Sequence, residues 1–220
     1  MPRVIEASEQ SAVAERFAHT SGLGKTGLAF VSQVHGNRVL NVRAAVDWIV
    51  VGEGDALMTR VPEMALIIRT ADCVPLVFFD AARGVLAVAH AGYQGVLAGV
   101  IESTIKAMEV AYKCRAADMQ VLFGPAICAQ HYDVSRATDD RVARFKNLFA
   151  QTDGVVHTDG ERVLLDLPGA CRILCVRSGV NGANIGAAGP CTFEHPAWPS
   201  HRREGEERHE NVWTWACLQK

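Results

Sequence analysis

Residues 64–91 read MALIIRTADCVPLVFFDAARGVLAVAHA and contain three short apolar runs separated by polar and turn-forming residues. The runs at 64–68, 76–79 and 85–89 are too short for typical helices and are rich in aliphatic and aromatic side chains, as buried strands are. Similar runs at 28–34, 39–42 and 48–51 precede this stretch. The sequence therefore predicts a sheet-rich centre for the chain.

The flanking segments add helices and further strands in no regular alternation. Apolar spacing predicts helices over 8–19, 94–112, 139–149 and 167–178, and strands over 119–123 and 163–165. This mixture favours an α+β fold with a mixed or antiparallel sheet and flanking helices over a doubly wound parallel sheet. Because no repeat or linker interrupts the chain before about residue 186, we expect one domain over residues 1–220.

The composition of the 220-residue chain excludes several classes of protein. With 49% hydrophobic and 21% charged residues, it is a globular sequence rather than a disordered, collagenous or coiled-coil one. The formal net charge of −2 and the absence of a long Lys/Arg run argue against nucleic acid as a partner. A small molecule is the expected substrate or ligand.

Two features bear on membranes and on cell compartment. The uncharged stretch 84–101 is long enough to raise the question of a membrane span, but its four glycines, His90 and Gln94 argue against one. The first 20 residues contain three glutamates and lack the apolar core of a secretory signal. We therefore expect a cytoplasmic protein without membrane association, whose seven cysteines serve as thiols or ligands.

The C-terminal region contains incomplete zinc patterns. Pro190-Cys191 matches half of the nucleoside-deaminase zinc signature, but Glu194 occupies the position of the second cysteine and no upstream H-x-E is present. The usual zinc-deaminase fold is therefore excluded. A structural zinc cluster built from Cys191, His195, His201 and His209 matches no standard spacing, so a polar tail is the favoured interpretation.

Three residues of metal-ligand type stand at the ends of predicted strands: His35, Cys73 and His90. Strand ends lie at the rim of a sheet, where polar side chains can converge without being buried unpaired. Two imidazoles and one thiolate give zinc three protein ligands and leave a fourth position open, which is the composition of a catalytic site. From spacing alone, a structural hydrogen-bonded role for each histidine remains open.

The chain resembles the laccase-domain, or polyphenol-oxidase-like, family of proteins. The resemblance rests on six blocks in the family's order: QVHG at 33–36, DALMT at 55–59, TADCVP at 70–75, HAGYQG at 90–95, GPAI at 124–127 with YDV at 132–134, and SHRR at 200–203. The TADCVP and HAG blocks together are highly specific for the family. The resemblance covers residues 33–203.

The resemblance implies a four-layer α-β-β-α fold, shared with a toxin deamidase that uses a Cys-His pair. It also implies that His35, Cys73 and His90 bind zinc. Members of the family are associated with purine nucleoside phosphorylase, adenosine deaminase and methylthioadenosine phosphorylase activities. Some bacterial members are associated with removal of wrongly built peptidoglycan precursors.

Zinc is favoured over copper by the histidine content. A multicopper centre needs many imidazoles, commonly in H-x-H pairs, whereas this chain has eight histidines and no such pair. A single blue-copper site uses two histidines, one cysteine and a distant methionine. Met58 or Met64 could supply that methionine, so copper polyphenol oxidation stays open as an alternative.

The residues around the ligands suggest roles in a purine nucleoside enzyme. Zinc lowers the pKa of bound water to about 7, which suits deamination of adenine. Phosphorolysis requires an anion site, for which Arg202 and Arg203 are the candidates because guanidinium binds oxyanions through paired donors. Asp72 could orient a ligand imidazole or transfer a proton. Gln33 and Asp55 could line the pocket, although fold-stabilising roles suit them equally.

Two departures from the family pattern concern substrate binding. The family usually has Trp-Arg where this chain has Tyr93-Gln94, which removes a positive charge beside a ligand. Glu206-Glu207-Arg208 replaces a small-residue turn before the family's arginine. The sequence therefore suggests a member whose specificity has changed.

Two other functions use the same residues. In a metal-free cysteine hydrolase, which could be a peptidoglycan-precursor amidase, Cys73 would be the nucleophile, His90 the base and His35 or Asp72 the orienting group. A binding or scaffold protein would keep the fold without turnover. A homodimer would be typical of the family, but nothing in the sequence determines it.

Overall fold

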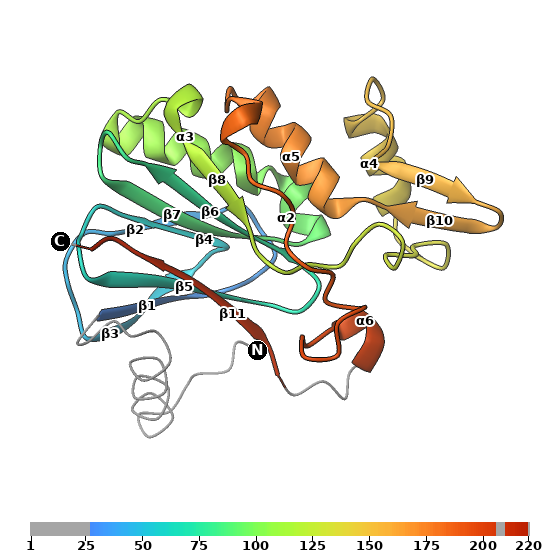
Figure 1. Ribbon diagram of the computed structural model, residues 1–220, viewed down its shortest axis with the longest axis horizontal. Coiled ribbons are helices and arrows are strands. Elements are labelled where there is room, and N and C mark those ends of the chain that lie inside the picture. Colours follow the sequence, from blue (N-terminus) through green and yellow to red (C-terminus); the bar gives the residue numbers. More distant parts are fainter. Residues whose placement is uncertain (1–26, 206–209, 220) are drawn as a thin grey trace.

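Two β-sheets lie face to face in this protein, and helices pack on the outer side of one of them (Figure 1). The computed structural model describes residues 27–205 and 210–219. The α+β class with mixed sheets, expected from the sequence, is confirmed. The described residues supply one helical layer and two sheet layers, and the predicted helix at 8–19 lies outside them.

The five-stranded sheet has the order β2-β4-β7-β6-β8, and the four-stranded sheet has the order β11-β5-β1-β3. The strands of the first are β2 (Val39–Val42), β4 (Ala56–Thr59), β7 (Val85–Ala91), β6 (Val74–Asp80) and β8 (Gln120–Phe123). The strands of the second are β11 (Val212–Cys217), β5 (Met64–Thr70), β1 (Gly27–Ser32) and β3 (Trp48–Glu53). A separate hairpin consists of β9 (Val156–Asp159) and β10 (Arg162–Leu165).

The helices are α2 (Tyr93–Ala98), α3 (Val100–Tyr112), α4 (Arg141–Leu148), α5 (Leu167–Arg177) and the short α6 (His201–Glu204). Two 3₁₀ turns, η1 (Ala116–Asp118) and η2 (Gly182–Asn184), flank β8 and α5 in sequence. Helices α2, α3 and α5 cover the five-stranded sheet, whereas α4 lies beside the β9–β10 hairpin (Figure 1).

Strand β7 shows why the central apolar runs form strands rather than helices. All of its residues are buried, because one face packs on the helices and the other on the second sheet. Ala87 and Ala89 belong to the cluster under the helices, whereas Val88 belongs to the cluster between the sheets. Small side chains beneath α3 let the helix approach the sheet closely.

Several details of the sequence prediction are wrong. The helix expected over 94–112 is broken at Gly99, whose left-handed φ of 84° ends α2 and begins α3. Strands β4, β9 and β11 were not expected. Strands β4 and β9 are short, and β9 and β11 are mostly exposed or half-buried. The uncharged stretch 84–101 forms β7, α2 and the start of α3. Within the described residues, no helix has the length and apolar character needed to cross a membrane.

The segment after α5 returns along the end of β8. Parallel bridges join Ile185 to Val121 and Cys191 to Ala126. Between these bridges, a Cβ atom added to Gly189 would lie 2.5 Å from the carbonyl carbon and oxygen of Gly124. Only glycine permits this approach of two backbones, and the approach sets the path of the chain toward α6.

Gly189→Ala should therefore lower the free energy of unfolding by about 1–3 kcal/mol, because the new methyl group meets backbone rather than a movable side chain. Gly182→Ala is the matched control, since a Cβ there has no neighbour within 4 Å, and its effect should stay within about 0.5 kcal/mol. Urea unfolding of both variants measures the difference. Equal stability of the two variants would contradict the close approach.

Candidate active site

The side chains of His35, Cys73 and His90 meet at one end of the two sheets. His35 lies in the loop after β1, Cys73 directly before β6, and His90 in β7. Their ligand atoms all lie within 4.8 Å of one another, and the two imidazole rings meet edge to face with centroids 4.7 Å apart. The structure thus brings together the three residues singled out in the sequence.

The backbone at His35 has a positive φ of 59°, which is unusual for a residue with a side chain. The carboxylate of Asp55 holds this conformation by accepting hydrogen bonds from three successive amides. The donors are the backbone N–H groups of Val34 at 3.3 Å, His35 at 2.9 Å and Gly36 at 2.6 Å. The loop is therefore fixed by a buried carboxylate rather than by its own turn chemistry.

Asp55 also orients the second imidazole. Its Oδ1 lies 2.8 Å from Nδ1 of His90, so the Nε2 atom of that ring is left for the cluster. A carboxylate that accepts from the far nitrogen of a ligating histidine fixes the ring and raises its basicity. Asp55, rather than Asp72, therefore holds the role of imidazole orienter.

Gly92 keeps space open at the centre of the cluster. A Cβ at this position would lie 3.0 Å from Cys73 Sγ, 3.0 Å from His35 Cδ2 and 3.7 Å from His90 Nε2. These contacts also show that the sulfur and the two rings surround the same small volume. A side chain at position 92 would occupy it.

The charges of the cluster are strongly coupled. Burial would raise the pKa of the Cys73 thiol, but the charge of His90 and hydrogen bonds from both imidazoles outweigh burial and lower it to about 6. Burial would lower the pKa of His90, but Cys73 and Asp55 outweigh burial and raise it to about 9. Without a metal, both shifts favour the thiolate form of Cys73 and the imidazolium form of His90.

The donor set fits a zinc ion. Ligands of a tetrahedral zinc lie roughly 3.3–3.8 Å apart, given metal–ligand bonds of about 2.0–2.3 Å. The three ligand atoms are within 4.8 Å of one another, so only small side-chain shifts are needed. Two neutral imidazoles and a thiolate leave a fourth position for another ligand.

A cavity of about 430 Å³ opens at the cluster. Its wall includes His35, Asp72, Cys73, Tyr93, Gln94, Ile127, Tyr132, Arg141, His201 and Arg202. The size lies in the range that accommodates small organic ligands. Aromatic rings and guanidinium groups thus share a pocket with the candidate metal ligands.

Asp72 anchors the C-terminal segment beside the cavity. Its Oδ1 accepts from Thr192 Oγ1 and its Oδ2 from the backbone N–H of Arg202, both at 2.6 Å. The residue has a positive φ of 85°, so these bonds also hold a strained turn next to Cys73. Asp72 positions Arg202 at the cavity wall.

The two arginines expected to bind phosphate differ in position. Arg202 lines the cavity, with its guanidinium 5.2 Å from the centroid of the Tyr132 ring and Nη1 donating to the Asp133 carbonyl. Arg203 instead donates to the backbone carbonyls of Thr192, Phe193 and Trp198. Its contacts stabilise the C-terminal segment.

Gln33 and the C-terminal histidines also have contacts of their own. Gln33 pairs with both backbone groups of Arg69, at 2.7 and 2.8 Å, which is the fold-stabilising alternative. His201 lines the cavity, and His195 Nδ1 accepts from Ala197 N. His209 lies outside the described residues. Cys191 lies near the side chains of Cys128, His131 and Glu194.

Arg141 was missed in the sequence. It projects from the start of α4 over the Tyr93 ring, 3.9 Å from its centroid, and is paired with Asp139 through two contacts of 2.6 Å. The pairing raises the pKa of Arg141 above its ordinary value. A cation thus stands beside Tyr93-Gln94 although position 94 is not arginine, and only the fold places it there.

Comparison with known proteins identifies the family of the chain. The model of the multi-copper polyphenol oxidoreductase laccase family matches residues 7–213. A purine nucleoside phosphorylase of Deinococcus radiodurans is 34% identical over 191 residues, which cover 87% of this chain and 71% of the relative. Adenosine deaminase RL5, from an unknown prokaryotic organism, is 34% identical over 158 residues, covering 69% of this chain and 57% of the relative.

The same fold occurs in a solved structure. YlmD from Geobacillus stearothermophilus superposes with a TM-score of 0.86 at 22% identity, over 98% of this chain and 82% of that protein. The matched family model spans most of the sequence, including His35, Cys73 and His90. The chain therefore belongs to the multi-copper polyphenol oxidoreductase laccase family.

Proposed function

We propose that this protein is a zinc-dependent enzyme of purine nucleosides, which cleaves them with phosphate and deaminates adenosine at the same site. The observation that carries the proposal is the meeting of His35, Cys73 and His90 at a cavity with aromatic and guanidinium groups in its wall. Relatives named purine nucleoside phosphorylase and adenosine deaminase support this substrate class.

The cavity offers groups suited to each part of the substrate. The rings of Tyr93 and Tyr132 line it and provide flat apolar surfaces of the kind on which purine bases stack. Arg202 and Arg141 also line it, and guanidinium groups bind phosphate oxygens through paired donors. The aromatic rings would therefore hold the base, and the guanidinium groups would hold the phosphate.

The chain's own groups prepare the cluster for a metal. When bound, zinc supplies a Lewis acid with one open coordination position. Cys73 provides a thiolate because its pKa is lowered to about 6 despite burial, through His90 and His35. Asp55 fixes the ring of His90 and the loop of His35 together. Asp72 holds Arg202 at the wall through its backbone amide.

A metal-free cysteine hydrolase is the second candidate, and one observation favours it. Cys73, His90 and Asp55 form a thiolate–imidazolium–carboxylate series, in which the carboxylate lies 2.8 Å from Nδ1 of the histidine. This is the arrangement of a nucleophile, its base and the group that orients the base. Metal content and thiol reactivity separate the two candidates.

Cys73→Ala should remove one zinc per chain and abolish nucleoside turnover, because the site loses its only anionic ligand. Plasma mass spectrometry and adenosine and inosine assays on protein purified without added metal measure both effects. Cys217→Ala is the control, since this half-buried thiol on β11 lies outside the cluster. It should keep metal and activity.

Iodoacetamide gives the complementary measurement. A zinc-bound Cys73 should resist alkylation until a chelator is added, whereas a free thiolate with a pKa of about 6 should react readily and stoichiometrically. Rapid labelling of Cys73 in protein that retains its zinc, or full zinc retention by Cys73→Ala, would overturn zinc binding at this site.

Arg202→Ala should raise the KM for phosphate and lower the rate of inosine phosphorolysis at least about tenfold. Adenosine deamination should fall much less, because only phosphorolysis needs the anion. Arg144→Ala is the matched control: it removes a half-exposed arginine of α4 that pairs with Asp140. Steady-state kinetics of both reactions measure the split. Equal loss of the two activities would show that Arg202 only supports the fold.

Asp55→Asn should weaken zinc binding about 10–100-fold, because His90 loses the carboxylate that fixes its ring. Competition with a chromophoric chelator measures the affinity. Thr59→Val is the control for stability. Thr59 is as buried as Asp55 and lies at the other end of β4, but its hydroxyl bonds to Val42 O and Val61 N rather than to a candidate ligand. Lower stability of Asp55→Asn with unchanged zinc affinity would leave Asp55 a purely structural role.

A further inference from the structure

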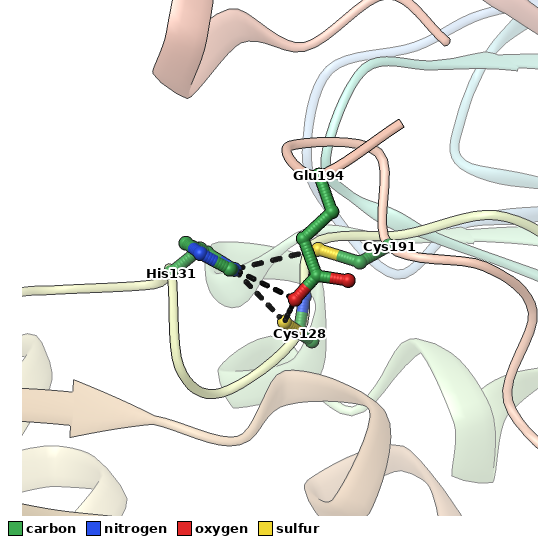
Figure 2. Close-up of side chains that lie close together, drawn as sticks. All are labelled: Cys128, His131, Cys191 and Glu194. Carbon is green, nitrogen blue, oxygen red and sulfur yellow. Dashed lines mark hydrogen bonds and ion pairs between the residues drawn. The ribbon is translucent and has the colours of Figure 1, made fainter. Parts of the chain in front are cut away.

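A second group of ligand-type side chains lies outside the active site. Cys128, His131, Cys191 and Glu194 point toward one another from two segments of the chain (Figure 2). One ligand atom from each residue lies within 4.8 Å of the others. None of the four belongs to the His35, Cys73 and His90 cluster.

The two segments are held side by side by their backbones. Ala126 and Cys191 form a parallel bridge, in which Ala126 N donates to Pro190 O at 3.2 Å and Thr192 N donates to Ala126 O at 3.0 Å. Within each segment, a tight turn follows the cysteine. His131 N donates to Cys128 O at 3.1 Å, and His195 N donates to Cys191 O at 3.2 Å.

Each turn places two residues that are three positions apart in sequence on the same side of its segment. Each segment thereby offers a pair, C-x-x-H at 128–131 and C-x-x-E at 191–194, with the two-residue spacer common among paired ligands of structural zinc sites. Glu194 stands where a second cysteine would complete the pattern that begins at Cys191. In the structure its carboxylate lies beside Cys128, His131 and Cys191 (Figure 2).

The distances match a tetrahedral ion. His131 Nδ1 lies 3.2 Å from Cys128 Sγ, 3.8 Å from Cys191 Sγ and 3.4 Å from Glu194 Oε1, and Cys128 Sγ lies 3.8 Å from the same oxygen. Four ligands around zinc at bond lengths of about 2.0–2.3 Å are separated by roughly 3.3–3.8 Å. The side chains need only small movements to close around an ion.

Contacts with neighbouring groups fix the orientation of these side chains, as they do for the ligands of known metal sites. The backbone N–H of Cys128 donates to Cys191 Sγ at 3.3 Å, which holds that sulfur in place beside the other three donors. The ring of His131 stacks on Phe193, with centroids 4.5 Å apart and an angle of 18° between the planes. The imidazole is therefore fixed with Nδ1 toward the sulfurs.

We propose that Cys128, His131, Cys191 and Glu194 bind a structural zinc ion, separate from the ion at the active site. Two thiolates, one imidazole and one carboxylate complete a tetrahedral shell without an open position, which is the mark of a structural rather than a catalytic site. The two thiols lose their protons to solvent when the ion binds.

The ion cross-links the two walls of the active-site cavity. Ile127 and Tyr132, which flank Cys128 and His131 in sequence, line one part of the cavity, and Arg202, eight residues after Glu194, lines another. Asp72 joins the same parts, because its backbone carbonyl accepts from Ile127 N and its carboxylate accepts from Thr192 Oγ1 and Arg202 N. The second zinc thus holds the wall that carries Arg202.

Zinc content of four full-length proteins tests the proposal. When the chain is purified without added metal or a metal-affinity column, the wild type should contain two zinc ions, Cys73→Ala one, Cys191→Ser one, and the double variant none. His195→Asn is the matched control, because His195 neighbours Glu194 but lies outside the cluster, and it should retain two.

Two measurements keep the test independent of folding defects. Glu194→Gln alters a side chain that is 59% exposed, so the protein should fold and show about tenfold or greater weakening of the second zinc in chelator competition. Cobalt substituted into Cys73→Ala should give an intense thiolate-to-metal charge-transfer band, which disappears in the double variant with Cys191→Ser.

The outcomes distinguish failure of the second site from failure of the first. Absence of metal from Cys73→Ala, or unchanged zinc content in Cys191→Ser, overturns the second site. A Cys128–Cys191 disulfide, detected as an intact mass lower by two hydrogens in metal-free protein as purified, overturns it too. One zinc that is lost with Cys191→Ser and kept by Cys73→Ala supports the second site and overturns zinc binding at the first.

Discussion

The buried carboxylate of Asp55 is the interaction on which the candidate active site depends. Burying a charge is costly unless several donors compensate it. Here three consecutive amides of the His35 loop and Nδ1 of His90 donate to the same two oxygens. The carboxylate sits directly before β4, so one side chain ties β4 to the loop after β1 and to β7. The ring of His90 and the backbone of the His35 loop are thereby fixed from one point.

A second carboxylate, Asp72, organises the opposite side of the cavity. It adjoins Cys73 and accepts from two groups of the C-terminal segment, which explains how residues 120–130 positions away in sequence reach the pocket. The contact between Gly189 and Gly124 and the cluster of Cys128, His131, Cys191 and Glu194 guide the same segment. Three independent constraints therefore place Arg202.

The structure shows what surrounds Tyr93-Gln94, the pair that replaces the family's Trp-Arg. The replacement of Trp-Arg by Tyr93-Gln94 removes a cation from α2, but Arg141 of α4 stacks on the Tyr93 ring at the cavity. Because Asp139 pairs with Arg141, the local charge is partly neutralised. Within the cavity wall, Arg202 is therefore an arginine without this Asp139 partner.

The sequence by itself determined the sheet-rich core, the mixed α+β class and the three candidate ligands. Continuous apolar runs are forced into buried strands, and His35, Cys73 and His90 stand where such runs end. The break at Gly99 and strand β11 were not determined in this way. A glycine inside a helical pattern can be tolerated, and a half-buried edge strand carries little periodic signal.

Only the tertiary structure decided which polar residues act together. Asp55 and Asp72 are both acids beside apolar runs, and local sequence does not tell which one accepts from an imidazole. Likewise, Cys191 has histidines near it in sequence, but it meets Cys128 and His131, which lie about 60 residues earlier. The sequence shows which chemical groups each segment carries. Which distant side chains meet depends on the path of the backbone between them.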